Sequence, residues 1–158
     1  MSDSAARLLE ALEGRGMTVA VAESLTGGLV CAAITAVPGA SRCFLGGIVA
    51  YAAPAKADVL GVPTSVLAMH GTVAAQTAQA MALAVRDRFG AQLGLATTGA
   101  AGPGWVGEHP PGTVFVAAAG PLPAVLVRHA ELSGTRDDVR AATVELALAA
   151  GLEALGAR

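Results

Sequence analysis

The spacing of apolar residues along the chain predicts an alternation of helices and strands. Leu8, Leu9 and Leu12 recur at the interval of a helical turn, and glycines at 14 and 16 then end that helix. Short apolar runs bounded by glycine, proline or polar residues indicate strands, whereas longer amphipathic or alanine-rich runs indicate helices. The predicted helices cover residues 4–12, 29–37, 55–60, 63–70, 73–89 and 137–155, and the predicted strands cover 18–23, 44–51, 93–97, 113–119 and 124–131.

This order of elements predicts an α/β fold, a three-layer α/β/α domain. Strands connected through helices are expected to be parallel, whereas the hairpin of residues 113–119 and 124–131 is antiparallel. The sheet should therefore be mixed and mainly parallel, with the hairpin and a final helix at the carboxyl end. A length of 158 residues suits a single domain over residues 1–158, and the sequence shows no internal repeat or linker.

Composition and charge narrow the class of protein. Charged residues make up 14% of the chain and the net charge is −2, with no cluster of basic or basic-plus-aromatic residues, so direct nucleic-acid binding is disfavoured. The apolar runs are too short or too interrupted to span a membrane, and the first residues lack the basic start of a signal peptide. We therefore expect a cytoplasmic protein.

Cys31 and Cys43 have no metal-ligand spacing and are expected to be buried thiols.

The most informative polar segment is Ala22-Glu-Ser-Leu-Thr-Gly-Gly28, which follows an apolar strand and precedes a helical pattern. The first N–H groups of a helix have no intrahelical partner and lie at the positive end of its dipole. Ser24 can act as a nucleophile in such a place, with Thr26, Gly27 and Gly28 around an anion or oxyanion site. The simpler alternative is that Ser24 or Thr26 only caps the helix.

Lys56 is the only lysine of the chain, and it ends the otherwise apolar segment Tyr51-Ala-Ala-Pro-Ala-Lys56. Removal from water lowers the pKa of a lysine, and a neutral lysine can accept the proton of a serine hydroxyl. The alternative is a solvated lysine on a short helix. Tyr51 is a candidate to orient or relay the proton, and it is equally suited to be an aromatic plug whose hydroxyl reaches water.

Polar residues follow three of the predicted strands. Ser24, Tyr51 and Thr98 each lie at the carboxyl end of a strand, where open α/β sheets gather ligand-binding residues. Thr98 opens a glycine-rich loop in which Gly99 lets the backbone approach a ligand. Trp105 in the same loop suggests a lid or a subunit contact as readily as incidental packing.

Arg136 and Arg140 are one helical turn apart at the start of the last predicted helix. A guanidinium beside a helix N-terminus is well suited to bind a phosphomonoester. The alternative is pairing with Asp137 or Asp138 inside the same helix. The pattern favours phosphate contact for Arg136 and the internal pairing for Arg140.

Together these motifs resemble the CinA C-terminal domain family, the nicotinamide mononucleotide (NMN) amidohydrolases. The matching segments span nearly the whole chain and are Ala22–Gly28, Gly47–Tyr51 with Lys56, His70-Gly71, Thr97–Pro103, Pro111–Val114 and Ser133–Arg136. The resemblance implies hydrolysis of the carboxamide of NMN to nicotinic acid mononucleotide and ammonia, without a metal or other cofactor. It also implies a homo-oligomer, because members of the family tend to self-associate.

Residue by residue, the resemblance implies that Ser24 attacks the amide, that Lys56 is the base and that Tyr51 assists. Thr98 and Arg136 would bind or stabilise the substrate. The larger proteins of the family also carry an amino-terminal nucleotide-pyrophosphatase domain, and that second activity is not expected of these 158 residues.

Three positions depart from the family pattern. Gly104 stands where the family commonly has aspartate, His109 where it often has lysine, and Ala74 where serine is frequent. These departures motivate an alternative function, a catalytically silent binding module linked to competence or DNA damage. A further alternative is a phosphate-binding protein in which Ser24 only caps a helix.

Overall fold

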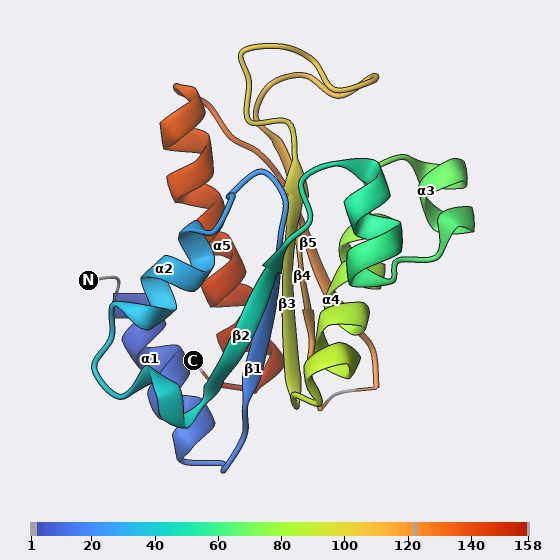
Figure 1. Cartoon of the computed structure of the whole chain (residues 1–158). Coiled ribbons are helices and arrows are strands. Elements are labelled where there is room, and N and C mark those ends of the chain that lie inside the picture. The colour runs from blue at the N-terminus through green and yellow to red at the C-terminus, as the bar shows by residue number, and fades with distance from the viewer. Residues whose placement is uncertain (1–2, 122, 158) are drawn as a thin grey trace.

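The computed structural model describes residues 3–121 and 123–157 and arranges them as one sheet between two helical layers (Figure 1). The strands are β1 (Val19–Glu23), β2 (Phe44–Val49), β3 (Leu93–Gly99), β4 (Thr113–Ala119) and β5 (Leu126–Glu131). The helices are α1 (Asp3–Glu13), α2 (Leu29–Thr35), α3 (Thr64–His70), α4 (Ala75–Phe89) and α5 (Arg136–Ala154). Two short segments are a 3₁₀ turn, η1 (Ala40–Arg42), and a π-helical segment, η2 (Ala55–Leu60).

The sheet has the strand order β2-β1-β3-β4-β5 and contains both strand directions. β1 is parallel to β2 and to β3, and its last residue, Glu23, pairs with Val49 on one side and Thr97 on the other. β4 is antiparallel to β3 and to β5. The predicted three-layer domain with a mixed sheet and a carboxyl-terminal hairpin and helix is confirmed. Because the carboxyl ends of β1, β2 and β3 meet at one edge, the residues that follow them are brought together.

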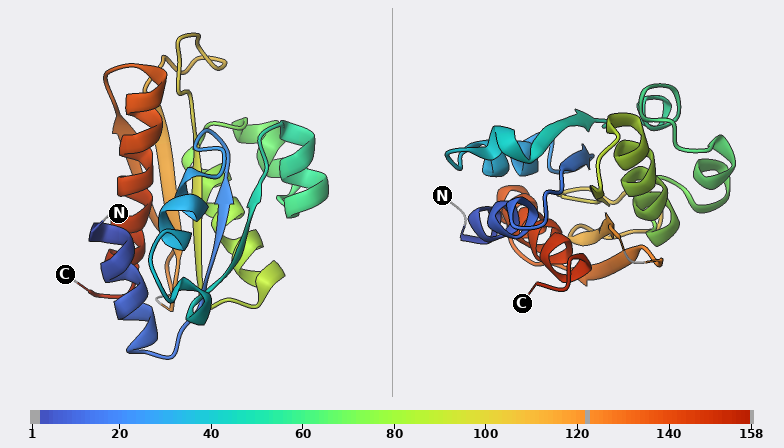
Figure 2. Two further views of the ribbon diagram at one scale, coloured as in Figure 1. Left: turned by 60° about the vertical axis from the view of Figure 1, so that its left-hand side comes forward. Right: turned by 90° about the horizontal axis from the view of Figure 1, so that it is seen from below.

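Helices cover both faces of the sheet, which explains why every residue of β1 is buried (Figures 1 and 2). Val19 and Val21 belong to the apolar cluster formed with α1, α2 and α5. Ala20 and Ala22 belong to the cluster on the opposite face, where Met81 of α4 packs. Since successive side chains of a strand point to opposite faces, a strand in the middle of three layers is apolar throughout.

Small residues allow α4 to lie close to the sheet. At Gly94 in β3, an added Cβ would overlap the carbonyl oxygen of Ala82 in α4. At Gly46 in β2, an added Cβ would lie 2.7 Å from the ring of Phe89 at the end of the same helix. The chain contains only 3% aromatic residues, so its core gains contacts from the close approach of backbones rather than from large rings.

The predicted elements occur in the predicted order, with small differences at their ends. β3 extends to Gly99, so Thr98 lies inside the strand rather than after it. The second strand of the hairpin begins at Leu126. Both cysteines are free thiols, and Cys43 is buried as expected, whereas Cys31 is only half-buried.

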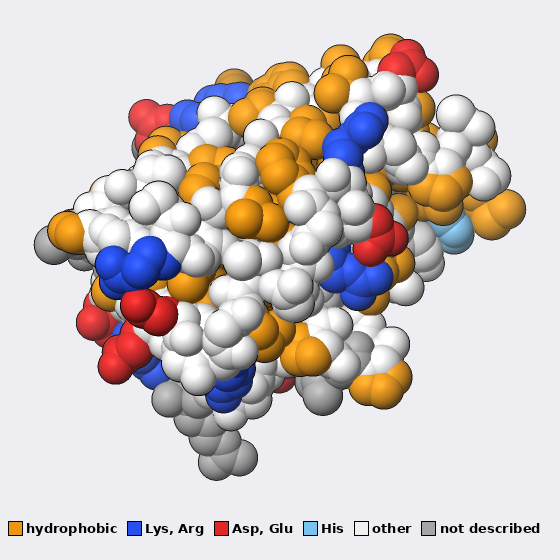
Figure 3. Space-filling view, turned by 60° about the horizontal axis from the view of Figure 1, so that its bottom comes forward, with side chains coloured by type: hydrophobic (Ala, Val, Ile, Leu, Met, Phe, Trp, Pro, Cys, Tyr) orange, Lys and Arg blue, Asp and Glu red, His pale blue; other side chains and the backbone are white. Residues whose placement is uncertain are grey.

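The described residues contain no membrane-spanning helix, and one face of them has no continuous basic surface. No helix in this part of the chain is long and apolar enough to cross a bilayer. On the face shown in Figure 3, basic side chains lie apart from one another, beside acidic or uncharged groups. This face therefore presents no continuous basic surface.

Replacement of Gly94 by alanine is expected to destabilise the fold, because the new methyl group would force α4 away from β3. We expect Gly94→Ala to lower the free energy of unfolding by about 1–3 kcal/mol, as overpacked cores typically do. Urea unfolding monitored by circular dichroism measures this change. Gly104→Ala is the matched control, because an added Cβ there meets no atom within 4 Å. Equal stability of the two variants would contradict the close approach of α4.

Candidate active site

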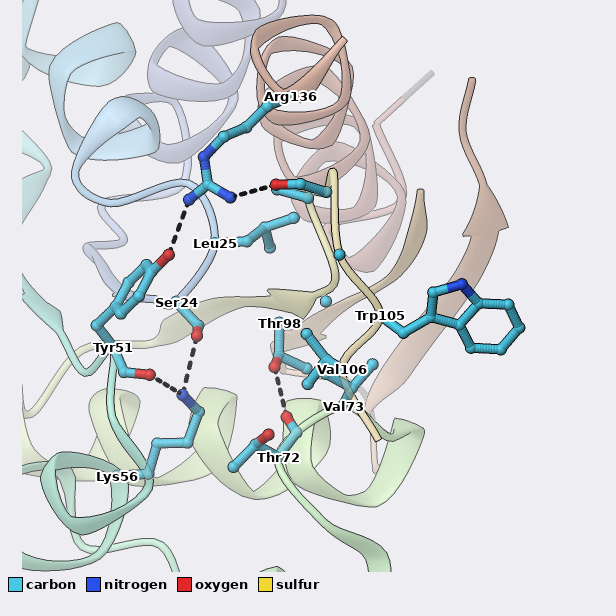
Figure 4. A pocket seen from close by; sticks show the side chains of 14 residues that line it. Ser24, Leu25, Tyr51, Lys56, Thr72, Val73, Thr98, Trp105, Val106 and Arg136 are labelled. Carbon is cyan, nitrogen blue, oxygen red and sulfur yellow. Dashed lines mark hydrogen bonds between the residues drawn. The ribbon is translucent and has the colours of Figure 1, made fainter. Parts of the chain in front are cut away.

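A pocket of about 320 Å³ opens at the edge of the sheet where β1, β2 and β3 end (Figure 4). The polar side chains that line it include Ser24, Tyr51, Lys56, Thr98 and Arg136. The first two come from segments that follow β1 and β2, and Thr98 comes from the end of β3. The structure therefore brings the three predicted strand-end residues to a single pocket, together with the lysine and one of the two arginines.

Ser24 and Lys56 are in direct contact at the base of this pocket. The Nζ atom of Lys56 donates a hydrogen bond to the Oγ atom of Ser24 at 2.9 Å. The same amine donates to the carbonyl oxygens of Ala50 at 2.7 Å and Tyr51 at 3.1 Å. Lys56 is fully buried and Ser24 nearly so. The three acceptors match the three N–H bonds of an ammonium group, so the amine is held in one position.

Burial changes the acid–base behaviour of Lys56. Because water is excluded from the amine and the ammonium form is disfavoured, the pKa of Lys56 falls from 10.5 to about 8. No carboxylate lines the described pocket to offset this effect. An amine with this pKa is neutral in an appreciable fraction of molecules near neutral pH, so it can accept the proton of the Ser24 hydroxyl.

Glu23 fixes the turn that carries Ser24, and sequence reasoning did not identify it. Its buried carboxylate accepts hydrogen bonds from the backbone N–H groups of Gly28 at 2.9 Å, Val30 at 3.1 Å and Cys31 at 2.8 Å. These groups form the N-terminus of α2, whose N-cap residue is Gly28. The alternative in which Ser24 caps this helix is therefore wrong. The expected anion site at this helix end is also wrong, because a carboxylate of the chain itself occupies it.

Thr26, Gly27, Gly28 and Arg140 lie around the Ser24 turn and are not part of the pocket lining. The structure therefore does not bring these four predicted substrate contacts to the pocket. Gly27 and Gly28 have φ angles of 58° and 102°, the left-handed region that favours glycine.

Hydrogen bonds from Thr26 and Arg140 attach the turn to its neighbours. The hydroxyl of Thr26 lies 2.7 Å from that of Thr97 in β3. The guanidinium of Arg140 donates to the carbonyl oxygens of Leu25 at 3.0 Å and Thr26 at 3.2 Å. Its contact with Asp137 is longer, at 3.5 Å, so this guanidinium chiefly holds the turn.

Arg136 crosses the mouth of the pocket (Figure 4). It is the first residue of α5, whose start is fixed by a reciprocal cap between Thr135 and Asp138. One nitrogen of its guanidinium donates to the carbonyl oxygen of Gly102 at 2.7 Å, and another donates to the hydroxyl of Tyr51 at 2.8 Å. Arg136 is thus placed to meet an anionic group that enters the pocket.

Tyr51 contacts Lys56 through its backbone rather than its side chain. Tyr51 is 57% exposed and its hydroxyl accepts a hydrogen bond from Arg136, whereas its backbone carbonyl oxygen accepts one from Lys56. The predicted proton relay through the Tyr51 hydroxyl is therefore not formed in this arrangement. The hydroxyl is better placed to orient Arg136.

Thr98 and Gly99 form part of the pocket floor. The Thr98 hydroxyl is buried and donates to the carbonyl oxygen of Thr72 at 2.5 Å, which joins β3 to the loop before α4. An added Cβ at Gly99 would lie 2.6 Å from the carbonyl oxygen of Thr113 in β4. The glycine is thus required by the neighbouring strand as well as placed beside the pocket.

The loop between β3 and β4 projects from the edge of the sheet (Figure 1). Trp105 in this loop is 66% exposed, and Figure 4 shows its ring pointing away from Ser24 and Lys56. Trp105 therefore does not cover the pocket in this conformation. Ala74, one of the positions that depart from the family pattern, is the N-cap of α4 and does not line the pocket. A serine there would cap a helix rather than contact a ligand.

Comparison with known proteins agrees with these motifs. The family model for the CinA C-terminal domain matches residues 1–155. The chain belongs to this family. A CinA-like protein of Frankia casuarinae is 48% identical over 89% of this chain and 32% of its own length. A putative competence-damage inducible protein of Geobacillus kaustophilus is 42% identical over 96% of this chain and 36% of its own length. The chain thus spans about a third of the length of the curated relatives it matches.

Solved structures of the family have the same fold. The competence/damage inducible protein CihA from Agrobacterium tumefaciens is 38% identical, with a TM-score of 0.91, over 98% of this chain and 94% of that chain. The competence damage-inducible protein A from Klebsiella pneumoniae is 32% identical, with a TM-score of 0.93, over 98% and 96%. These proteins share the arrangement of strands and helices over nearly their whole lengths.

The titration of Lys56 can be observed directly, because the chain has a single lysine. In protein labelled with carbon-13 at the lysine ε position, we expect one signal whose chemical shift titrates with a midpoint near pH 8. In urea-unfolded protein the same signal should titrate near the ordinary lysine value of about 10.4. Identical midpoints in the folded and unfolded protein would show that the amine is not desolvated.

Proposed function

We propose that this protein is a metal-independent amidohydrolase that converts NMN to nicotinic acid mononucleotide and ammonia. The observation that carries the proposal is the 2.9 Å contact between the Ser24 hydroxyl and the buried Lys56 amine. A weak nucleophile needs a base within hydrogen-bond reach, and this pair meets that requirement. The choice of NMN as the substrate comes from the resemblance to the CinA family.

The first half of the proposed reaction acylates Ser24. Neutral Lys56 takes the hydroxyl proton while Oγ forms a bond to the amide carbon, which becomes tetrahedral. Lys56, now an ammonium, gives that proton to the amide nitrogen. The C–N bond then breaks, ammonia leaves and the acyl group stays on Ser24 as an ester. Lys56 ends this half neutral, so no external acid or base is consumed.

The second half hydrolyses the ester by the reverse use of the same groups. Lys56 takes a proton from a water molecule whose oxygen forms a bond to the acyl carbon. The proton passes to Oγ as the C–Oγ bond breaks, which restores the Ser24 hydroxyl and releases the acid. The product carboxylic acid then ionises in water. Both halves place proton transfer on one amine, so activity depends on its neutral form.

The remaining lining residues suit a mononucleotide. Leu25, Val73 and Val106 give the pocket an apolar wall against which a pyridine ring can pack. Arg136 lies at the mouth with two N–H donors bonded to Tyr51 and Gly102, and a guanidinium has five N–H bonds. Its remaining donors can therefore meet the 5′-phosphate without loss of these contacts.

Ammonia release from NMN should depend on both members of the pair. We expect Ser24→Ala and Lys56→Met each to lower kcat by about a thousandfold or more, because the first removes the nucleophile and the second removes its base. In the unmodified protein, kcat should rise with pH and level off above about pH 8, as Lys56 loses its proton. A coupled ammonia assay at 25 °C measures these rates, with and without a chelator.

Ser41→Ala is the matched control, because Ser41 is exposed in the 3₁₀ turn before β2 and lies outside the pocket. It should retain full activity. Folding of each variant is checked by circular dichroism. A folded protein that binds NMN without releasing ammonia would contradict the proposal and favour the silent binding module instead.

If Arg136 binds the phosphate, its removal should weaken activity toward NMN but not toward a substrate that lacks the phosphate. Arg136→Ala should raise KM for NMN by about 10- to 100-fold, the range expected when a hydrogen-bonded charge partner is removed. Nicotinamide riboside lacks the phosphate, so its hydrolysis should change little. Steady-state kinetics with both substrates test this difference. Arg42→Ala is the control, because Arg42 pairs with Glu13 on the surface. An equal loss of activity toward both substrates would show that Arg136 does not bind the phosphate.

A further inference from the structure

A second pocket of about 290 Å³ adjoins the first and is not used in the mechanism above. The two pockets share Thr72, Val73 and Val106, so they lie next to each other. The second, here called the side pocket, adds His70, Glu108 and His109. Arg136 lines only the first pocket. The pocket that holds Arg136 and Ser24 thus adjoins a second one with different chemistry.

The chemistry of amide cleavage indicates which part of the substrate lies toward the side pocket. On the proposed function, Arg136 holds the phosphate of the acyl portion. Lys56 must reach the amide nitrogen to protonate it, so the leaving nitrogen lies beside the lysine amine. Figure 4 shows the Lys56 amine and Thr72 on the side of the Ser24 hydroxyl away from the Arg136 guanidinium. A substituent on the leaving nitrogen would therefore point toward the side pocket.

The side pocket is open enough to hold such a substituent. Gly71 and Gly107 line it, and an added Cβ at either position would meet no atom within 4 Å. Both have positive φ angles, a conformation that favours glycine, so a side chain is disfavoured at either position. Two of the three shared residues, Val73 and Val106, are apolar, whereas the ionisable side chains of the side pocket line it alone.

We propose that the side pocket binds a substituent on the amide nitrogen, so that the protein also hydrolyses N-substituted carboxamides of the same nucleotide. This inference rests on the proposed function and extends its substrate class. The bond changes are those given above, except that C–N cleavage releases a primary amine in place of ammonia. Water supplies the oxygen of the acid, and no oxidant or further reactant is needed.

The lining favours one kind of substituent. Val73 and Val106 suit a short alkyl chain next to the nitrogen. Beyond them Glu108 contributes a carboxylate, and the imidazoles of His70 and His109 contribute hydrogen-bonding groups. A short alkyl chain that ends in an ammonium group matches this order of apolar and acidic surfaces. The preferred substrate class is therefore the N-(aminoalkyl) amide.

The test compares NMN with its N-(3-aminopropyl) and N-butyl amides, with release of the amine and of the acid nucleotide measured by chromatography. We expect the unmodified protein to hydrolyse the aminopropyl amide with a kcat/KM within about tenfold of that for NMN, the discrimination of a pocket that accommodates the added group. Because the measured quantity is the ratio of two substrates on one protein, partial misfolding of a variant does not affect it.

Two variants test the side pocket itself. His70→Trp fills it and should lower the ratio of aminopropyl amide to NMN activity by about tenfold or more. Met69→Trp is the matched control, since Met69 is 77% exposed on the same helix and lines neither pocket. Its ratio should not change. Glu108→Gln should lower the preference for the aminopropyl over the butyl amide by about two- to fivefold, the effect of losing one exposed ion pair.

The outcomes separate this inference from the function on which it rests. Hydrolysis of NMN without hydrolysis of either N-substituted amide would overturn the inference and leave the proposed function intact. An unchanged ratio in His70→Trp would also overturn it, because the substituent would then lie elsewhere. Inertness toward all three amides would overturn the proposed function and this inference together.

Discussion

The contact between a buried amine and a nearly buried hydroxyl is the constraint on which the site depends. Lys56 gains no ion-pair partner among the described pocket residues, and it is instead held by Ser24 and two backbone carbonyl groups. An ammonium in such surroundings is costly, so the environment shifts the equilibrium toward the neutral amine. Burial of this lysine therefore lowers the stability of the fold, and it produces an amine that can act as a base near neutral pH. A salt bridge at this position would have kept the amine charged and would have removed that ability.

The precision of the Ser24 position comes from residues that lie outside the pocket. Glu23 binds the first turn of α2 on one side, and Arg140 binds the carbonyl groups of Leu25 and Thr26 on the other. The Glu23 carboxylate is bonded to backbone N–H groups and does not neutralise Lys56, and the Arg140 guanidinium is bonded chiefly to backbone carbonyl groups rather than facing the pocket. The sheet supports this arrangement because β1 lies between β2 and β3 and is buried on both faces. A nucleophile on a rigid strand end, held by hydrogen bonds to its turn, needs little reorganisation during reaction.

The sequence predicts the architecture and the members of the central pair because both leave local signals. Apolar spacing identifies the strands, and the strand ends then place Ser24 and Thr98 at one edge. The isolation of Lys56 in an apolar segment indicates its burial. The roles of Glu23, Arg140 and the Tyr51 hydroxyl leave no such signal, because each depends on which backbone groups come within about 3 Å after folding. Arg140 is the clearest case, since its partners are more than a hundred positions away in the chain. Charge and helical spacing suggest a phosphate contact or pairing inside the helix, and only the tertiary structure shows that the carbonyl oxygens of the Ser24 turn bind this guanidinium.

The three departures from the family pattern lie at different places relative to the Ser24–Lys56 pair. Ala74 affects the start of α4, and His109 lines the side pocket, so neither reaches the contact between Ser24 and Lys56. Gly104 lines the mouth, where the family commonly has an aspartate. Without that carboxylate, Arg136 and Lys56 are the charged side chains among the described lining residues, and both are basic. The mouth should therefore attract a phosphate more strongly and a cationic ring less strongly than it would with aspartate at position 104. On the proposed function, glycine at position 104 would shift recognition toward the phosphate end of the nucleotide, and it leaves the contact between Ser24 and Lys56 in place.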